Sequence, residues 1–281
     1  MKLAYLTQIE EESFQTAARI GYDCLEVHGK WETEQLDDPD QLRREADAVR
    51  ELIEESGVGI SAIALFRPGF EEPEKRIARY SAYIRLCEEL DLDTITTLSG
   101  AVEEGNLEEN LDYFESVFSE VAPRAEEAGV KIAFENWPGL QGTFPPIHTI
   151  NFAYTPDAWE RMFELVDSPV LGLEFDPSHL VWQGIEWAEA LDRFSHRIHH
   201  AHAKDTEVFR DQLSSDGFFS AGWWRYRLPG YGCVDWHKFT SMLKELGYEG
   251  TLSVEHEDPV FMDERWNEGL QKAHDYLRPL V

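Results

Sequence analysis

The sequence contains few cysteines: Cys24, Cys87 and Cys233 are scattered along the chain, and no CxxC pair occurs. An odd, dispersed set argues against a disulfide framework and against a zinc site built from thiolates, and it favours a reducing compartment. No run of about 18 apolar residues is present, which argues against a membrane span. The first residues, MKLAYLTQIEEESF, turn acidic before an apolar run develops, so no signal peptide is expected. These absences predict a cytoplasmic protein.

Basic residues are also scarce. Lys and Arg together number 25 against 55 Asp and Glu, so the formal net charge is -30. Such a surface repels phosphate backbones and anionic lipids, so no nucleic acid and no membrane surface is expected as a partner. Two explanations of the acidity stay open. One is solubility through like-charge repulsion, and the other is adaptation to high salt, since Lys is scarce next to Arg.

The sequence lacks nucleotide-binding glycine motifs and linkers. Neither GxGxxG nor GxxxxGK[ST] occurs, and no Pro/Gly/Ser-rich or low-complexity tract divides the chain. Instead, eight short apolar runs are each followed by an amphipathic segment. The expected strands cover 2–6, 24–28, 59–66, 93–98, 130–135, 170–176, 197–203 and 250–255. The expected helices lie near 11–20, 38–57, 73–90, 107–128, 156–167, 185–195, 235–247 and 262–278.

This alternation predicts one α/β domain over residues 1–281, a single (β/α)8 TIM barrel. The expected strands are mostly apolar, as strands buried on both faces of a parallel sheet are. A doubly wound open sheet is the alternative, but it normally has fewer units and a Gly-rich nucleotide turn. The segment between the seventh strand and its helix, at about 204–234, is too long for a simple turn.

Polar residues gather where the last four expected strands end. In a (β/α)8 barrel these ends meet at one face, where active sites lie. Carboxylates and an imidazole buried there without partners would be costly, and a divalent cation would offset that cost. Oxygen and imidazole ligands without thiolate favour Mn²⁺ or Mg²⁺, with Co²⁺, Ni²⁺ or Zn²⁺ as alternatives. The ligand-type residues are Glu135, Asp176, His202 and Glu255.

The run HRIHHAHAKD, residues 196–205, holds four histidines that cannot all face one site. Side chains of a strand alternate between its two sides. If His202 points into the barrel, His200 shares its side one layer deeper and His199 faces the outer helices. Lys204 then lies at the barrel mouth. Glu174 falls in the same deeper layer as His200, so a buried contact between these two side chains is expected.

Four motifs, IAFEN, FDPSH, HAHAKD and SVEHEDP, occur in this order on the last four expected strands and jointly resemble the xylose-isomerase-like barrels. The resemblance covers nearly the whole chain. That superfamily includes sugar isomerases and epimerases such as D-tagatose 3-epimerase, hydroxypyruvate isomerase, inosose dehydratase and endonuclease IV. In its epimerase branch, one divalent ion, usually manganese, is held by a Glu, an Asp, a His and a second Glu. Carried over by motif, the resemblance implies that Glu135, Asp176, His202 and Glu255 are the ligands. It also implies that Glu135 and Glu255 are the catalytic pair that moves a proton.

Further residues at the mouth are candidates for contacting substrate. The resemblance implies this role for the histidine of the DPSH turn. The other candidates have alternative roles, namely as exposed surface residues, as core residues or as charges that compensate the acidic surface. The segment at about 204–234 is expected to be a lid or substrate-binding segment, and packing at the subunit interface of a homo-oligomer is its alternative. The candidate substrate-binding residues are His179, His28, Trp137, Lys204, Arg225 and Arg227.

The sequence thus predicts an enzyme with a small carbohydrate substrate. The expected activity is that of a divalent-metal-dependent isomerase or epimerase, which abstracts a proton next to a metal-bound carbonyl. A lyase, either a dehydratase or an enzyme that cleaves oxo-glycosides, is the alternative that uses the same site. An enzyme of the endonuclease IV type would need histidines at the ends of the third and fourth strands, where the sequence reads ALFRP and TTLSG. A noncatalytic binding barrel is disfavoured because all four ligand-type residues are present.

Overall fold

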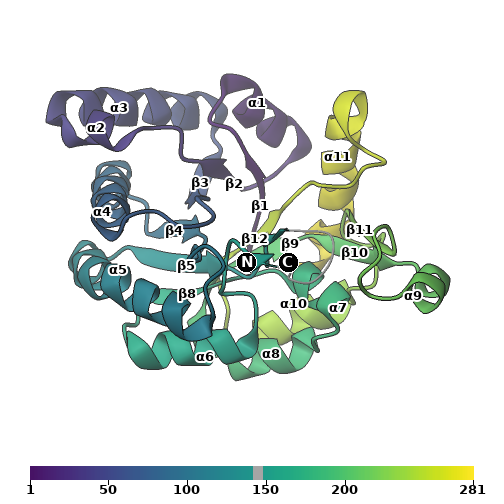
Figure 1. The fold of residues 1–281 in the computed structure, drawn as a ribbon. Helices are drawn as coiled ribbons and strands as arrows, with labels where there is room; N and C mark the ends of the chain where they lie inside the picture. The colour runs from purple at the N-terminus through teal and green to yellow at the C-terminus, as the bar shows by residue number, and fades with distance from the viewer. Residues whose placement is uncertain (142–147) are drawn as a thin grey trace.

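Eight parallel strands close into a barrel in the computed structural model, which describes residues 1–141 and 148–281 (Figure 1). The strands follow one another around the barrel in chain order, and β1 closes the ring against β12. They are β1 (Lys2–Thr7), β2 (Cys24–His28), β3 (Gly59–Leu65), β4 (Thr94–Thr97), β5 (Lys131–Glu135), β8 (Leu171–Phe175), β9 (Ile198–Ala203) and β12 (Thr251–Val254). The closed ring confirms the predicted (β/α)8 barrel.

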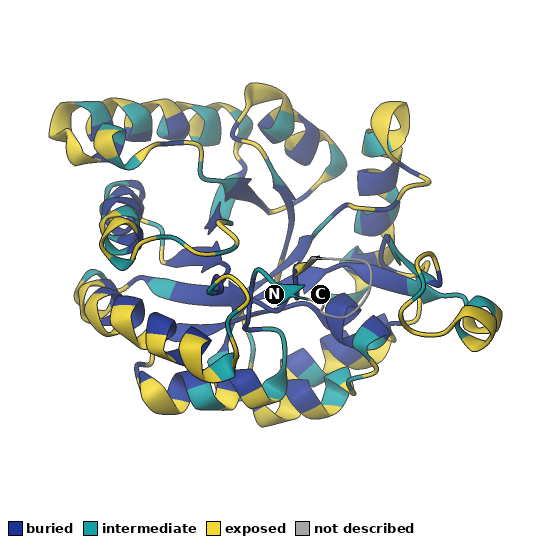
Figure 2. Ribbon diagram, viewed as in Figure 1, coloured by how far each residue is buried: buried dark blue, intermediate teal, exposed yellow. Residues whose placement is uncertain are grey.

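Helices surround the barrel and bury one face against the strands, while their outer faces are exposed (Figure 2). Burial of one face and exposure of the other follow from the amphipathic pattern of these segments. The outer helices are α1 (Glu11–Ile20), α3 (Pro39–Ser56), α4 (Pro73–Leu90), α5 (Leu107–Ala128), α6 (Pro156–Leu165), α8 (Trp187–Arg193), α10 (Trp236–Glu245) and α11 (Trp266–Leu277). All eight lie where the sequence predicts helices. Within the described residues, no helix combines the length and apolarity that crossing a membrane requires.

The ends of these helices follow ordinary capping chemistry. The Asp38 side chain accepts hydrogen bonds from two backbone N–H groups in the first turn of α3, and Gly57 ends that helix with a φ of 72°. The left-handed conformation is favoured at glycine because it has no Cβ. Asp235 likewise caps α10 by accepting a hydrogen bond of 3.0 Å from the N–H of Lys238.

Short elements that the sequence pattern did not predict lie in the connections. Each helix among them has seven residues or fewer, which is too short for an apolar period of 3.6 to show. The elements are α2 (Thr33–Asp37), α7 (Pro177–Gln183), α9 (Arg210–Asp216), the hairpin β6 (Leu140–Gln141) with β7 (His148–Thr149), the hairpin β10 (Asp205–Val208) with β11 (Trp224–Arg227), and the 3-10 turns η1 (Ser195–Arg197), η2 (Asp263–Arg265) and η3 (Arg278–Leu280). The segment expected as a long loop is therefore partly a β-hairpin.

A single buried carboxylate ties the end of this segment to the barrel. Asp205 accepts hydrogen bonds from the backbone N–H groups of Gly230, Gly232 and Val234 at 3.0–3.1 Å, and from Trp236 Nε1 at 2.9 Å. A Cβ at Gly232 would lie 2.3 Å from Asp205 Oδ1. Glycine is needed there because the backbone approaches the carboxylate so closely.

Candidate metal centre

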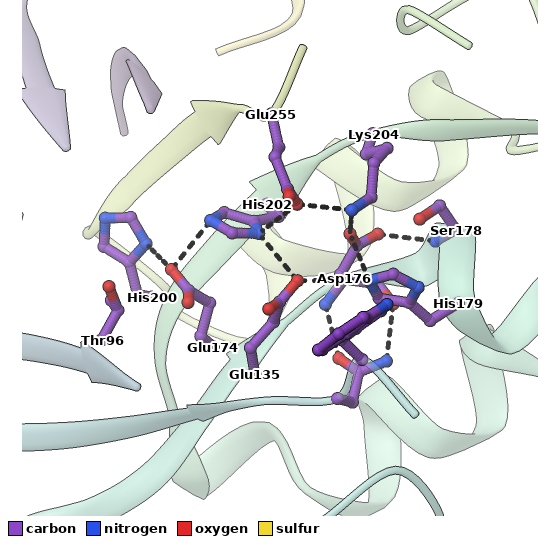
Figure 3. Close-up of polar contacts among 12 residues, drawn as sticks. Thr96, Glu135, Glu174, Asp176, Ser178, His179, His200, His202, Lys204 and Glu255 are labelled. Atoms are coloured by element: carbon purple, nitrogen blue, oxygen red, sulfur yellow. Dashed lines mark hydrogen bonds and ion pairs between the residues drawn. The ribbon is translucent and has the colours of Figure 1, made fainter. Parts of the chain in front are cut away.

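Four side chains from neighbouring strand ends converge at one end of the barrel (Figure 3). One ligand atom from each lies within 4.8 Å of the corresponding atoms of the others. We call this set the rim cluster: Glu135 at the end of β5, Asp176 after β8, His202 on β9 and Glu255 after β12. Glu135, Asp176 and His202 are buried, and Glu255 is partly exposed. The structure thus brings together the four residues predicted as metal ligands.

The rim cluster suits a divalent cation. Asp176 Oδ2 and His202 Nδ1 are buried and have no hydrogen-bond partner in the described part of the chain. His202 Nδ1 lies 3.0 Å from Glu255 Oε2 and 3.4 Å from Glu135 Oε1, at ion-pair distance without hydrogen-bond geometry. Buried polar atoms without partners are rare because they lose their hydration. Three carboxylates and one imidazole are also a donor set that Mn²⁺, Mg²⁺ or Zn²⁺ accepts.

The surroundings keep the two glutamates of the rim cluster charged. Burial by itself raises the pKa of Glu135, but the hydrogen bond with His179, the proximity of His202 and the charge of Lys204 hold that pKa well below its usual range. Burial also acts to raise the pKa of Glu255, and the charge of Lys204 outweighs it and lowers that pKa. Both carboxylates are therefore ionised at neutral pH and are able to accept a proton.

Lys204 lies at the centre of these charges. Its Nζ is 2.6 Å from Glu255 Oε2, 3.2 Å from Glu257 Oε2 and 3.5 Å from Asp176 Oδ2. It also lies 4.5 Å from the ring centroid of Tyr226. Lys204 is buried, and a buried ammonium group is tolerated because these carboxylates surround it. The lysine thus neutralises part of the carboxylate charge next to the cavity.

His179 is held between the rim cluster and the β10–β11 hairpin. Its Nε2 lies 3.1 Å from Glu135 Oε1 and 3.3 Å from Asp176 Oδ2, and its Nδ1 lies 2.9 Å from Tyr226 Oη. The ring is fully buried, and both nitrogens face protein groups. The resemblance implied that this histidine contacts substrate. The structure places it behind the carboxylates, in contact with Glu135 and outside the lining of the rim cavity, and its contact with substrate stays a prediction.

A second layer of polar side chains lies deeper in the barrel. We call Glu26, Glu174 and His200, together with His202, the lower cluster, and their ligand atoms also lie within 4.8 Å of one another. The expected contact is confirmed, since His200 Nδ1 lies 2.8 Å from Glu174 Oε1. His202 Nε2 lies 3.0 Å from Glu26 and 3.0 Å from Glu174. Carboxylates at this position fix the tautomer and orientation of a metal-binding imidazole.

Burial and the neighbouring charge of Glu26 raise the pKa of Glu174 to about 7. By contrast, although burial acts to raise it, the pKa of Glu26 is held below its usual range by the neighbouring His202 and His200. Thr96 also donates a hydrogen bond of 2.6 Å to Glu26 Oε1. Glu26 was not among the residues predicted from the sequence, although one signal was available. It is the only charged residue in the apolar run CLEVH, and alternation places it on the same side of β2 as His28.

A cavity of about 520 Å³ opens above the rim cluster, and we call it the rim cavity. Three of the candidate substrate-binding residues line it, namely His28, Trp137 and Lys204. Glu135 and Glu255 line it too, so both predicted catalytic glutamates reach the same space. The remaining described lining residues are Leu6, Phe66, Pro68, Leu98, Tyr226, His256, Glu257 and Trp266.

The two candidate arginines do not line the rim cavity, because their side chains lie on the face of β11 that points away from this cavity. Arg225 Nε lies 2.8 Å from Glu207 Oε2, and Arg227 Nε lies 2.8 Å from Asp258 Oδ2. Tyr226, between them, points to the cavity. Strand side chains alternate, so a hairpin that presents Tyr226 to the site must direct both arginines away from it. Here the arginines pair with acidic neighbours, and their contact with substrate stays a prediction.

The comparisons with known proteins agree with this architecture. A family model described as Xylose isomerase-like TIM barrel matches residues 14–280. The chain is similar to an inosose dehydratase from Clostridium perfringens, with 29% identity over 161 residues that cover 55% of this chain and 49% of the relative. The alignment therefore spans about half the length of that curated relative.

Two solved structures share the fold. One is 3-keto-D-glucoside 4-epimerase, YcjR, from E. coli, with a TM-score of 0.74, 16% identity and coverage of 99% of both chains. The other is IolI protein with a bound zinc atom, with a TM-score of 0.72, 22% identity and coverage of 100% of this chain and 98% of that one. Since the family model spans nearly the entire sequence, the chain belongs to the Xylose isomerase-like TIM barrel family.

Proposed function

We propose that the protein is a divalent-metal-dependent isomerase or epimerase of a sugar or sugar-like substrate, which acts by proton abstraction next to a carbonyl. One observation carries the proposal. Glu135 and Glu255, two carboxylates from different sides of the barrel, line a single cavity, and both belong to a four-residue donor cluster. Structural neighbours that are sugar epimerases support the proposal.

The rim cluster would hold the ion, and Mn²⁺ is the ion we propose, with Mg²⁺, Co²⁺, Ni²⁺ and Zn²⁺ as alternatives. A divalent cation bound there supplies Lewis acidity that stabilises negative charge on the substrate oxygens. The zinc in the IolI neighbour supports a metal in this fold. The lower cluster contributes by fixing the His202 ring through its Nε2.

The chain's own groups would divide the proton chemistry. One glutamate removes the proton beside the carbonyl, and the other returns a proton from the opposite side in an epimerase. Return by the same glutamate to a neighbouring carbon gives an isomerase instead. Tyr226 and His179 hold Glu135 in place, and Lys204 holds Glu255. Both carboxylates thereby stay ionised and oriented toward the cavity before substrate enters.

A lyase is the second candidate, and the inosose dehydratases among the curated relatives favour it. If the substrate carries a leaving group β to the abstracted proton, the same abstraction leads to its elimination. An endonuclease IV-like activity is disfavoured. Leu65 ends β3 and Thr97 ends β4, so neither barrel strand supplies a histidine there, and the net charge of -30 repels DNA.

Solvent-deuterium exchange tests the proposal. The Mn²⁺-loaded protein is incubated in D₂O with ketoses, inososes and 3-oxo-glycosides, and the C–H signals beside the carbonyl are followed by NMR. Exchange, with or without a new epimer, supports the proposal. Elimination with little exchange into recovered substrate supports the lyase. A protein that binds one equivalent of metal but neither exchanges a proton of any substrate of these classes nor eliminates a group from it would contradict both candidates.

A further inference from the structure

A second cavity of about 480 Å³ adjoins the rim cavity. Trp137 and Tyr226 line both, so a ligand that fills the rim cavity and extends past these two rings enters the second one. We call it the aromatic cavity. Its other described lining residues are Pro138, Leu140, Trp182, Phe218, Phe219, Ser220, Ala221, Trp223 and Trp224.

Aromatic rings form a continuous path from one cavity into the other. Trp224 and Tyr226 lie on the same face of β11, with ring centroids 4.8 Å apart. Trp224 in turn stacks on Trp182, with centroids 4.6 Å apart and an interplanar angle of 1°. Phe218 extends the path through Trp223, with centroids 5.4 Å apart, and its side chain is 49% exposed. Large exposed apolar side chains grouped at a cavity are typical of a binding surface.

The polarity of the aromatic cavity differs from that of the rim cavity. None of its described lining residues carries a charge, whereas Lys204 and the carboxylates line the rim cavity. A second sugar would need several polar groups for its hydroxyls, and the aromatic cavity offers few. A flat apolar ring matches it better.

We propose that the aromatic cavity is a subsite for the aglycone of a glycoside, with the reacting oxidised sugar in the rim cavity. The substrate class would then be 3-oxo-glycosides with an aromatic aglycone rather than free monosaccharides. This inference rests on the proposed function, because that function places the reacting carbonyl sugar in the rim cavity.

The test compares glycosides that differ only in the aglycone. Phenyl and methyl 3-oxo-β-D-glucoside are assayed with the Mn²⁺-loaded protein for proton exchange in D₂O. Dissociation constants are measured in parallel for phenyl and methyl β-D-glucoside, which lack the carbonyl and do not react. We expect the phenyl compound to be preferred about tenfold in both assays, because stacking and apolar burial act on the aryl group alone.

Variants of the aromatic cavity then show which side chains cause the preference for the phenyl over the methyl compound. Trp224→Ala and Phe218→Ala should reduce the phenyl-to-methyl ratio toward about 1, while Trp224→Tyr, which keeps a ring, should retain most of it. The ratio is informative even if a variant is partly destabilised. Phe70→Ala removes an aromatic side chain that is also 49% exposed but lies outside both cavities, so it should keep the wild-type ratio.

The possible outcomes distinguish a failure of the proposed aglycone subsite from a failure of the proposed function. Equal binding of phenyl and methyl glucoside, or a preference that both Trp224→Ala and Phe218→Ala leave intact, would overturn the subsite. Tighter binding of a β-linked disaccharide than of phenyl glucoside would also overturn it, in favour of a second sugar. A Trp224-dependent phenyl preference in binding, without proton exchange in any carbonyl sugar, would support the subsite and contradict the proposed function.

Discussion

The hydroxyl of Tyr226 lies 2.9 Å from Nδ1 of His179, whose Nε2 lies 3.1 Å from Glu135. A residue of the long β9–α10 connection thus reaches a predicted catalytic carboxylate through one imidazole. The link fixes the histidine ring from both sides. It also couples the position of the β10–β11 hairpin to the orientation of Glu135.

Tyr226→Phe tests this link. The variant keeps the ring beside Lys204 but loses the hydroxyl, so the histidine is held from one side only. A lost hydrogen bond of this kind lowers kcat about fivefold to tenfold if it orients the base. We expect metal content to be unchanged, as measured by elemental analysis. Tyr231→Phe, which alters an exposed tyrosine, is the matched control. An unchanged kcat in Tyr226→Phe would show that the link does not orient Glu135.

Replacing the two glutamates one at a time tests their catalytic roles. Glu135→Gln and Glu255→Gln each keep an oxygen ligand but lose the basic charge, so each should lower turnover by about 10²-fold or more. In an epimerase, one of them still exchanges deuterium from the face that keeps its carboxylate. The double variant should exchange none. Wild-type exchange by the double variant, measured by NMR, would refute carboxylate catalysis in the rim cavity.

Metal removal should affect stability as well as activity. The rim cluster concentrates buried carboxylates, and a bound cation stabilises the folded state that contains them. At a free metal concentration about 100 times the dissociation constant, the gain is about 2.7 kcal/mol, which corresponds to roughly 5 °C in Tm. Differential scanning calorimetry with and without chelator and added Mn²⁺ measures it. Asp176→Asn should lose most of the response, and an equal response in that variant would place the ion elsewhere.

His199 should make stability depend on pH. Burial lowers its pKa from 6.5 to about 4, with a smaller contribution from the charge of Lys131. The unfolded chain therefore binds more protons than the folded protein between these values, and the stability contributed by neutral His199 is lost as pH falls from 6.5 toward 4. We expect His199→Gln to remove about 1–2 kcal/mol of the difference in unfolding free energy between pH 5 and 7.

Urea unfolding at the two pH values measures this difference. His196→Gln alters an exposed histidine of the same run and should behave as wild type. The same pH dependence in wild type and His199→Gln would show that His199 titrates normally in the folded protein.

Asp205 should be a stability residue rather than a catalytic one. Its carboxylate accepts hydrogen bonds from the ends of the β9–α10 connection, and burial raises its pKa although these bonds oppose the rise. Asp205→Ala leaves several buried donors without an acceptor, so we expect a loss of about 2–4 kcal/mol in unfolding free energy. Asp216→Ala, at an exposed position on α9, should lose little. Equal stability of the two variants by chemical denaturation would contradict the anchoring role.

Some contacts of the site could be predicted from the alternation of residues along the sequence, and others could not. Strand alternation correctly placed Glu174 beside His200, because both side chains lie on the inner face of adjacent strands. The same rule could not select Tyr226 over Arg225 and Arg227, because β11 was not recognised as a strand. With a hairpin in that segment, alternation alone would have excluded the arginines from the rim cavity.

The repeating apolar periodicity of the sequence was enough to predict the barrel and its eight outer helices. The positions of polar residues at the strand ends were enough to predict that Glu135, Asp176, His202 and Glu255 converge. These features follow from local patterns and from the closure that eight buried parallel strands require. Only the tertiary structure decided the contact of Glu26 with His202, the burial of His179 behind Glu135 and the aromatic cavity along Trp224. These contacts join segments that are far apart in the chain, and their partners depend on the register and packing of elements that no local period specifies.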